Sequence, residues 1–131
     1  MAYGSLLADV VQSSTSSPVT FKNTSGTEIG TLCRAWVTFD GTGTVAIRGS
    51  FNVSSITDNG SGDYSVNFTT AMPDANYSVV MSADAATGSG GIPYNGLSYV
   101  GYSPTGSFAR VRTTTSGAFA DSAAVCVAIF R

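Results

Sequence analysis

The sequence predicts an all-β fold: an antiparallel, jelly-roll-like β-sandwich of about eight short strands with an extended N-terminal arm. Three observations predict it. Apolar and polar residues alternate within short segments, clusters of Gly, Asp and Asn separate these segments, and no stretch repeats its apolar residues with a helical period. The chain is also rich in Ser, Thr and Gly, which suit strands and tight turns better than helices.

Two regions differ in character. We expect residues 1–32 to form an arm or attachment segment and residues 33–131 to form the β-sandwich knob. The arm carries a brief apolar cluster, followed by Ser, Thr and Pro, and is too short to build a core of its own. Its apolar side chains, Leu6, Leu7, Val10 and Val11, therefore need a neighbouring molecule to cover them.

The strand pattern of the knob begins at Cys33. The predicted strands are Cys33–Phe39, Thr44–Phe51, Val53–Thr57, Tyr64–Thr69, Tyr77–Ala83, Leu97–Tyr102, Phe108–Thr114 and Ala123–Phe130. In the first, Val37 and Phe39 face one way and Trp36 the other; in the second, Val45, Ile47 and Phe51 share one side. Turns are expected at residues 40–43 and 58–63, because Gly allows the positive φ that a tight hairpin needs. Residues 72–76 form a corner around a proline, and a loop-rich region follows residue 84.

The low charge of the chain bears on its partners. Only 11% of residues are charged, against about a quarter in an average domain, and the net charge is −2. This favours an oligomer whose subunits cover one another over a monomer with a hydroxyl-rich surface. Trp36, the only tryptophan, is interpreted either as an anchor at a subunit interface or as ordinary packing on the second face of its strand.

Several function classes lack the residues that they need. With no histidine, Ser-His-Asp and Cys-His centres and Cys/His metal sites are impossible. No basic patch predicts nucleic-acid binding, and no segment predicts a signal peptide or membrane insertion, so we expect synthesis in a cytoplasm. Cys33 and Cys126 are interpreted as two small buried apolar residues, with a disulfide between the first and last core strands as the alternative.

Three carboxylates could in principle serve a glycosidase: Asp58 and Asp63 in one turn and Asp84 in a loop. We favour turn chemistry, in which Asp accepts backbone hydrogen bonds, and predict no catalytic residue, cofactor or metal. A Ca²⁺ ion bound by oxygens of the Asp58–Asp63 turn is the remaining alternative.

One long stretch carries a resemblance. Residues 34–80 read RAWVTFDGTGTVAIRGSFNVSSITDNGSGDYSVNFTTAMPDANYSVV. This string resembles a module in the C-terminal part of tail-fibre proteins of tailed bacteriophages and in small phage virion proteins, with a looser likeness at Gly26–Cys33 and Val127–Arg131. The resemblance implies a non-enzymatic virion structural protein, a homotrimer of β-sandwich knobs, made in the bacterial host cytoplasm and located on the virion surface.

Two roles follow from that resemblance. In the first, the protein is a tail-fibre-like knob that binds a host surface glycan or protein, with Tyr94 and Tyr102 as receptor contacts in the loop-rich region. In the second, it is a capsid decoration (cement) protein whose arm clamps neighbouring capsid subunits. Either role requires contacts with sibling subunits and with other virion proteins of the tail or capsid. The candidate interface residues are Leu6, Leu7, Val10, Val11 and Trp36.

Overall fold

The computed structural model describes residues 10–12, 19–84, 94–95, 105–115 and 118–131. It confirms the all-β class, because every element in these residues is a strand and every strand pairing is antiparallel. The same residues contain no helix that could cross a membrane. The chain divides after Leu32 into two units, Met1–Leu32 and Cys33–Arg131.

The first unit contains a small hairpin that the sequence pattern did not predict. Strands β1 (Phe21–Lys22) and β2 (Glu28–Gly30) pair across a turn. The side-chain carbonyl of Asn23 holds this turn, because its Oδ1 accepts hydrogen bonds from the backbone N–H groups of Ser25 at 3.0 Å and Thr27 at 2.9 Å. Every described side chain of both strands is exposed. Hydrogen bonds therefore hold the turn of this hairpin, but its described side chains form no hydrophobic core.

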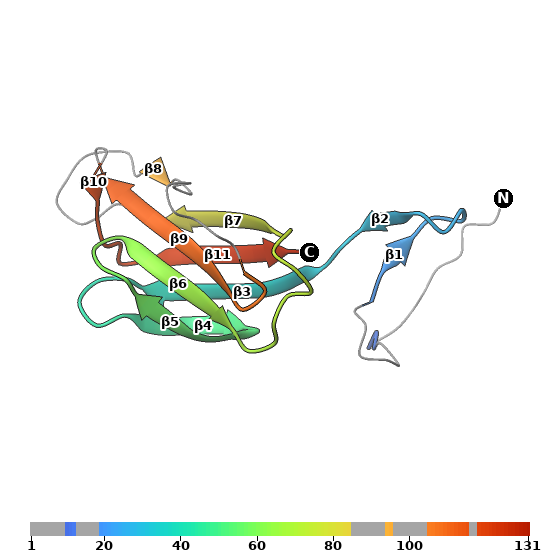
Figure 1. Ribbon diagram of the computed structural model, residues 1–131, viewed down its shortest axis with the longest axis horizontal. Coiled ribbons are helices and arrows are strands. Elements are labelled where there is room, and N and C mark those ends of the chain that lie inside the picture. Colours follow the sequence, from blue (N-terminus) through green and yellow to red (C-terminus); the bar gives the residue numbers. More distant parts are fainter. Residues whose placement is uncertain (1–9, 13–18, 85–93, 96–104, 116–117) are drawn as a thin grey trace. The chain divides into compact units, whose positions relative to one another are not determined.

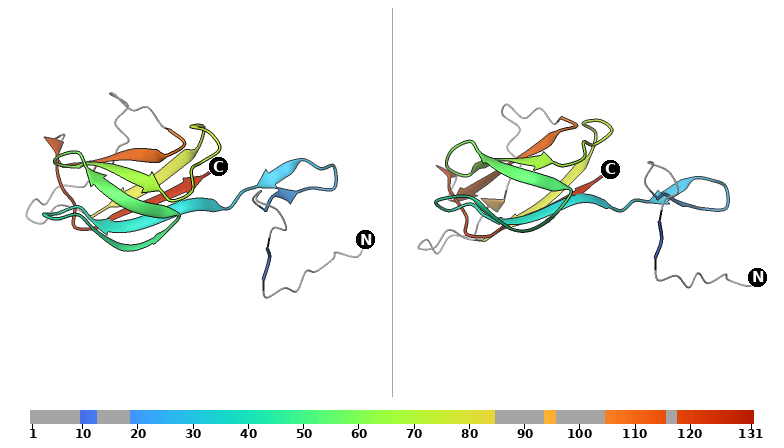
Figure 2. Two further views of the ribbon diagram at one scale, coloured as in Figure 1. Left: turned by 60° about the horizontal axis from the view of Figure 1, so that its bottom comes forward. Right: turned by 90° about the horizontal axis from the view of Figure 1, so that it is seen from below.

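The second unit consists of two sheets packed face to face (Figures 1 and 2). One sheet has the order β4-β3-β11-β7, made of β3 (Cys33–Asp40), β4 (Ala46–Phe51), β7 (Ser78–Ala83) and β11 (Val125–Phe130). The other has the order β10-β9-β6-β5, made of β5 (Val53–Asp58), β6 (Asp63–Phe68), β9 (Phe108–Thr115) and β10 (Ala118–Phe119), and β8 (Tyr94–Asn95) also pairs with β9. In Figure 1, β6 and β9 cross over β3 and β11. The sandwich is present, whereas the jelly-roll likeness stays a prediction.

The core lies between these sheets and follows the predicted alternation. Its members come mainly from the inward faces of β3, β6, β9 and β11: Ala35, Val37, Phe39, Tyr64, Val66, Phe68, Ala109, Val111, Val125, Val127 and Ile129, joined by Val53 and Met72. The rings of Phe39 and Tyr64 meet edge to face at 5.1 Å between centroids, which joins the two layers.

The predicted orientation of Phe51, the last residue of β4, is wrong. The register between β3 and β4 shifts between Thr38 and Phe39, so Phe51 comes opposite Trp36 and faces outward, with 56% of its surface exposed. Arg48 lies within the irregular stretch and its Nη2 binds Asp40 Oδ2 at 2.8 Å. The irregularity moves Phe51 from the core side to the outer side. The predicted strand Leu97–Tyr102 lies outside the described residues.

Asn52 forms the corner where the chain leaves the first sheet for the second. Its φ of 54° lies in the left-handed region, which asparagine tolerates better than most residues. Its Nδ2 donates to the carbonyls of Arg34 and Thr70, both at 3.1 Å, and its Oδ1 accepts from the N–H of Thr70 at 2.7 Å. One side chain therefore ties β3, the corner and the segment after β6 together.

Replacing Asn52 with alanine is expected to lower the free energy of unfolding by about 2 kcal/mol, because it removes these three hydrogen bonds and places a less tolerant residue at positive φ. Asn52→Gly keeps the φ accessible and should lose less. Urea denaturation of both variants measures the difference. An Asn52→Ala protein as stable as the parent would contradict the role of this side chain.

Candidate functional site

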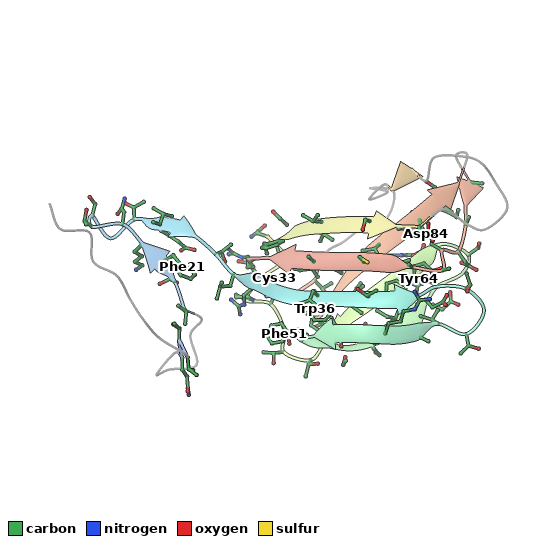
Figure 3. The ribbon with its side chains drawn as sticks, turned by 180° about the vertical axis from the view of Figure 1, so that it is seen from behind. Phe21, Cys33, Trp36, Phe51, Tyr64 and Asp84 are labelled. Atoms are coloured by element: carbon green, nitrogen blue, oxygen red, sulfur yellow. The ribbon has the colours of Figure 1, made fainter. Side chains whose placement is uncertain are left out.

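The outer surface of the β4-β3-β11-β7 sheet has an uncharged central part, which we call the apolar face. It consists of the outward side chains Trp36, Thr38, Gly49, Phe51, Ser78, Val80, Ser82, Cys126, Ala128 and Phe130. Figure 3 looks onto this sheet, with Trp36 on β3 beside Phe51 at the end of β4. Trp36 is 42% exposed and Val80 is 60% exposed, so large apolar side chains stand uncovered on this face of the chain.

Strand pairing arranges the centre of the apolar face in two rows. The large row crosses the sheet as Phe51, Trp36, Ala128 and Val80. The small row, next along the strands, crosses it as Gly49, Thr38, Cys126 and Ser82. Cross-strand neighbours on one face lie about 5 Å apart, so each row is a continuous band of side chains. The face is therefore raised at Phe51, Trp36 and Val80 and lower at Ala128 and along the small row.

A groove of about 320 Å³ lies on this face above β11. Trp36 forms one wall and Val80 the other, while Ala128 and Cys126 lie between them on the central strand. Thr38 and Ser82 supply the hydroxyl groups of the lining. The lining contains no ionisable side chain other than the thiol of Cys126, so the groove favours an apolar occupant over a charged one.

The two cysteines do not pair. Both are free, and in the sheet Cys126 lies opposite Thr38 whereas Cys33 lies opposite Phe130. Four residues along a strand separate these positions by about 13 Å, beyond the span of a disulfide. The expectation that both are buried is wrong for Cys126, which is exposed in the groove because β11 alternates and residue 126 falls on the outer side.

Within the described residues, charged side chains on this side of the sheet lie at the two ends of β3, and Arg48 of β4 pairs with Asp40 at one of these ends. Arg34 lies at one end, and its guanidinium has no ion-pair partner among the described residues. Asp40 lies at the other end. Hydrogen bonds from Thr42 and then the Arg48 guanidinium hold the pKa of Asp40 below its usual value, so this end keeps an ionised carboxylate.

The outer surface of the second sheet, which we call the polar face, has a different chemistry. Asp63 on β6 is almost fully buried and accepts hydrogen bonds from two arginines of β9. Arg110 binds it through Nε and Nη2, both at 2.7 Å, and Arg112 binds it through Nε at 2.8 Å. The Arg110 hydrogen bonds, aided by Arg112, hold the pKa of Asp63 below its usual value despite its burial. Arg112 also lies over the Phe119 ring, 5.0 Å from its centroid.

This arrangement changes the interpretation of the Asp58–Asp63 turn. Asp58 behaves as predicted, because its Oδ1 accepts the N–H of Gly60 at 2.9 Å in the turn. Both oxygens of Asp63 are instead engaged by arginine, which leaves the carboxylate poorly suited to bind Ca²⁺ or to transfer a proton. No group of three potential metal ligands exists within the described ranges. Sequence spacing could not reveal the pair, because Asp63 and Arg110 come from strands far apart in the chain.

A second buried polar cluster closes the end of the sandwich. The Tyr64 hydroxyl lies 2.8 Å from Asp121 Oδ1 and 3.0 Å from the Gly41 carbonyl, and Asp121 Oδ1 also accepts the N–H of Gly62 at 2.7 Å. Burial and then the neighbouring Asp121 carboxylate raise the pKa of Tyr64 far above its ordinary value. The phenol is thus held protonated as a structural donor.

The predicted interface and receptor residues have different outcomes. Trp36 faces outward as its alternation predicts, and Val10 and Val11 are exposed. Leu6, Leu7 and Tyr102 lie outside the described residues, and Tyr94 lies on β8, where only the backbone is described. The sequence pattern missed Phe51, Cys126 and Ala128 as neighbours of Trp36, and Val80 on the far side of β11. Only the strand order and register bring these residues together.

Comparison with known proteins adds no relative. No protein-family model, no curated protein and no solved structure matches this chain. The geometry of the two sheet faces and the residue string at 34–80 therefore carry the functional argument.

Proposed function

We propose that this chain is a non-enzymatic structural protein of a tailed-bacteriophage virion, a tail-fibre-like host-recognition knob that assembles through its apolar face. The observation that supports assembly through this face is the outward band containing Trp36, Phe51 and Val80, which is exposed between the charged ends of β3. Such a band is costly to leave in water and typical of a surface that another subunit covers. The virion location rests on the resemblance of residues 34–80 to the tail-fibre module.

The contrast between the two sheet faces supports the same proposal. On the polar face, Asn67 Nδ2 donates to Ser55 Oγ at 3.0 Å and to Thr57 Oγ1 at 2.9 Å, so hydroxyl and amide groups are held by one another. A face of this kind is stable in water. We propose that the polar face points to solvent and that the apolar face contacts a sibling subunit. We also propose that Tyr94 and Tyr102, in the region that the sequence predicts to be loop-rich, contact a host surface glycan or protein.

Capsid decoration is the second candidate, and one observation favours it. The N-terminal unit exposes the apolar side chains Val10, Val11, Phe21, Ile29 and Leu32 outside any core. An arm with this surface suits docking onto other virion proteins, such as the subunits of a head shell.

Phage particles that lack the protein distinguish these roles. For a recognition knob, we expect intact heads with loss of adsorption to host cells, and we expect the purified chain to bind those cells and compete with the phage. Fragile heads with normal adsorption, together with hundreds of copies per particle, would instead identify a decoration protein. A chain absent from purified virions would contradict both roles.

A further inference from the structure

We infer that the polar face binds a saccharide that carries a carboxylate, with Arg110 of β9 binding the carboxylate and the hydroxyl and amide groups of β5 and β6 binding the sugar. This inference rests on the proposed host-recognition role and adds to it a ligand class and the residues that contact the ligand. A face that points to solvent in the particle is also a face that a ligand outside the particle can reach.

The ion cluster of the polar face has more positive than negative charge. Arg110 and Arg112 share the single carboxylate of Asp63, so the three side chains together carry a charge of +1. The Arg110 side chain is 33% exposed and that of Asp63 only 11%, so an approaching ligand meets the guanidinium before the carboxylate. The whole chain carries −2, which makes this positive charge a local property of the face. A ligand with a negative group would balance the cluster.

Arg110 keeps one edge of its guanidinium available for such a group. Its Nε and Nη2 both donate to Asp63, at 2.7 Å, whereas its Nη1 donates to no described residue. A guanidinium has five N–H donors in a planar fork, so Nη1 and the second hydrogen of Nη2 remain for two parallel hydrogen bonds. A carboxylate is the group whose two oxygens match that geometry.

Hydroxyl and amide groups lie beside Arg110 across the neighbouring strands (Figure 1). Ser65 on β6 is opposite Arg110, and Thr57 on β5 is opposite Ser65. In the next row, Asn67 Nδ2 donates to the hydroxyl oxygens of Ser55 and Thr57. Among the described residues, none accepts a hydrogen bond from these two hydroxyl groups or donates one to Asn67 Oδ1. Each group therefore has one hydrogen bond within the face and further capacity for a ligand.

This combination fits a saccharide better than a simple anion. A sugar hydroxyl both donates and accepts, and the face offers hydroxyl donors together with the Asn67 Oδ1 acceptor. Adjacent strands are about 4.8 Å apart, so Arg110 and Thr57 lie about 10 Å from each other, the length of two sugar units. The side chains already hold one another in place, so little affinity is lost in ordering them.

Two pairs of saccharides test the inference on the full-length protein. We expect trigalacturonate or sialyllactose, which carry carboxylates, to bind with a Kd of about 1 mM and to shift the Arg110 Nε–H signal in proton–nitrogen NMR spectra. The methyl ester of trigalacturonate and plain lactose lack the charge and should bind at least about tenfold more weakly. Inorganic phosphate tests charge alone and should leave the Asn67 side-chain amide signals in place.

Substitutions then locate the site. Thr57→Glu puts a carboxylate beside it and should weaken binding of the acidic saccharide about tenfold by repulsion. Thr44→Glu is the matched control and should leave binding unchanged, because Thr44 is exposed in the turn between β3 and β4 and the net charge of both variants is the same. Arg110→Lys keeps a positive charge without the planar fork and should also weaken binding about tenfold. Circular dichroism confirms that each variant folds, and the comparison of charged and uncharged saccharides needs no substitution.

The outcomes separate this inference from the proposed function. Failure of both acidic saccharides to bind at about 10 mM would overturn the inference, as would equal affinity for their uncharged counterparts or equal losses in Thr57→Glu and Thr44→Glu. Phosphate that binds as tightly as the acidic saccharides would show a simple anion site and would overturn it as well. Adsorption to host cells is measured separately, so a chain that adsorbs without binding these saccharides would retain the recognition role and lose the inference.

Discussion

Replacing Gly62 with alanine is expected to lower the free energy of unfolding by about 4 kcal/mol, a large part of the stability of a small domain. The φ of Gly62 is 63°, and an added Cβ would meet the carbonyl oxygen of Thr113, with the Ala120 N at 2.6 Å and its O at 2.8 Å. These atoms belong to backbone that pairs with the turn, since the Thr113 N–H donates to the Gly62 carbonyl at 2.8 Å. They cannot move aside as a flexible side chain could.

Gly43→Ala is the matched control. Its φ of 61° nearly equals that of Gly62, yet nothing lies within 4 Å of the position that a Cβ would take. Alanine there should cost only the backbone strain, about 1 kcal/mol. Urea denaturation of both variants separates strain from collision. Equal losses at the two positions would show that the close approach of Thr113 on β9 and of Ala120, just after β10, to Gly62 does not contribute.

Alternation along single strands was the part of the fold that the sequence could predict. Val37 and Phe39 on β3, and Val66 on β6, are buried as the period of two requires, and Trp36 faces outward as predicted. These properties depend on neighbouring residues only, because a strand in a sandwich has one side toward the core wherever it is placed. The all-β class follows from the same local signal.

Features that depend on which strands pair, and in which register, could not be predicted from the alternation of residues along one strand. The outward turn of Phe51 depends on the irregular register beside Arg48, and the left-handed corner at Asn52 depends on carbonyls of two other segments. The groove likewise requires Trp36 and Val80 to lie on either side of β11, the last strand in the chain. Sequence alone therefore indicated that Trp36 faces away from Val37 and Phe39, but not what surrounds it.

Replacing Asp63 with asparagine is expected to lower the free energy of unfolding by about 3 kcal/mol at pH 7, because it leaves Arg110 and Arg112 close together without their shared carboxylate. The Arg112 side chain is only 14% exposed, so water compensates poorly for the loss. Asp58→Asn is the matched control in the same turn: its exposed side chain keeps an oxygen that can accept the Gly60 N–H, and it should change stability little.

The pH dependence of this loss of stability tests the role of the ion pair more specifically. The two arginines lower the pKa of Asp63 in the folded chain below its unfolded value of about 3.9, so the stabilisation is complete above that value. It is lost as the pH falls through the lower folded-state pKa. The stability difference between the parent and Asp63→Asn should therefore be constant from about pH 7 to pH 5 and shrink below about pH 4. Asp40 and Asp74 also have lowered pKa values, but both proteins retain them, so the difference isolates Asp63. A difference that stays constant down to about pH 2 would mean that asparagine disturbs packing and that the ion pair is not the cause.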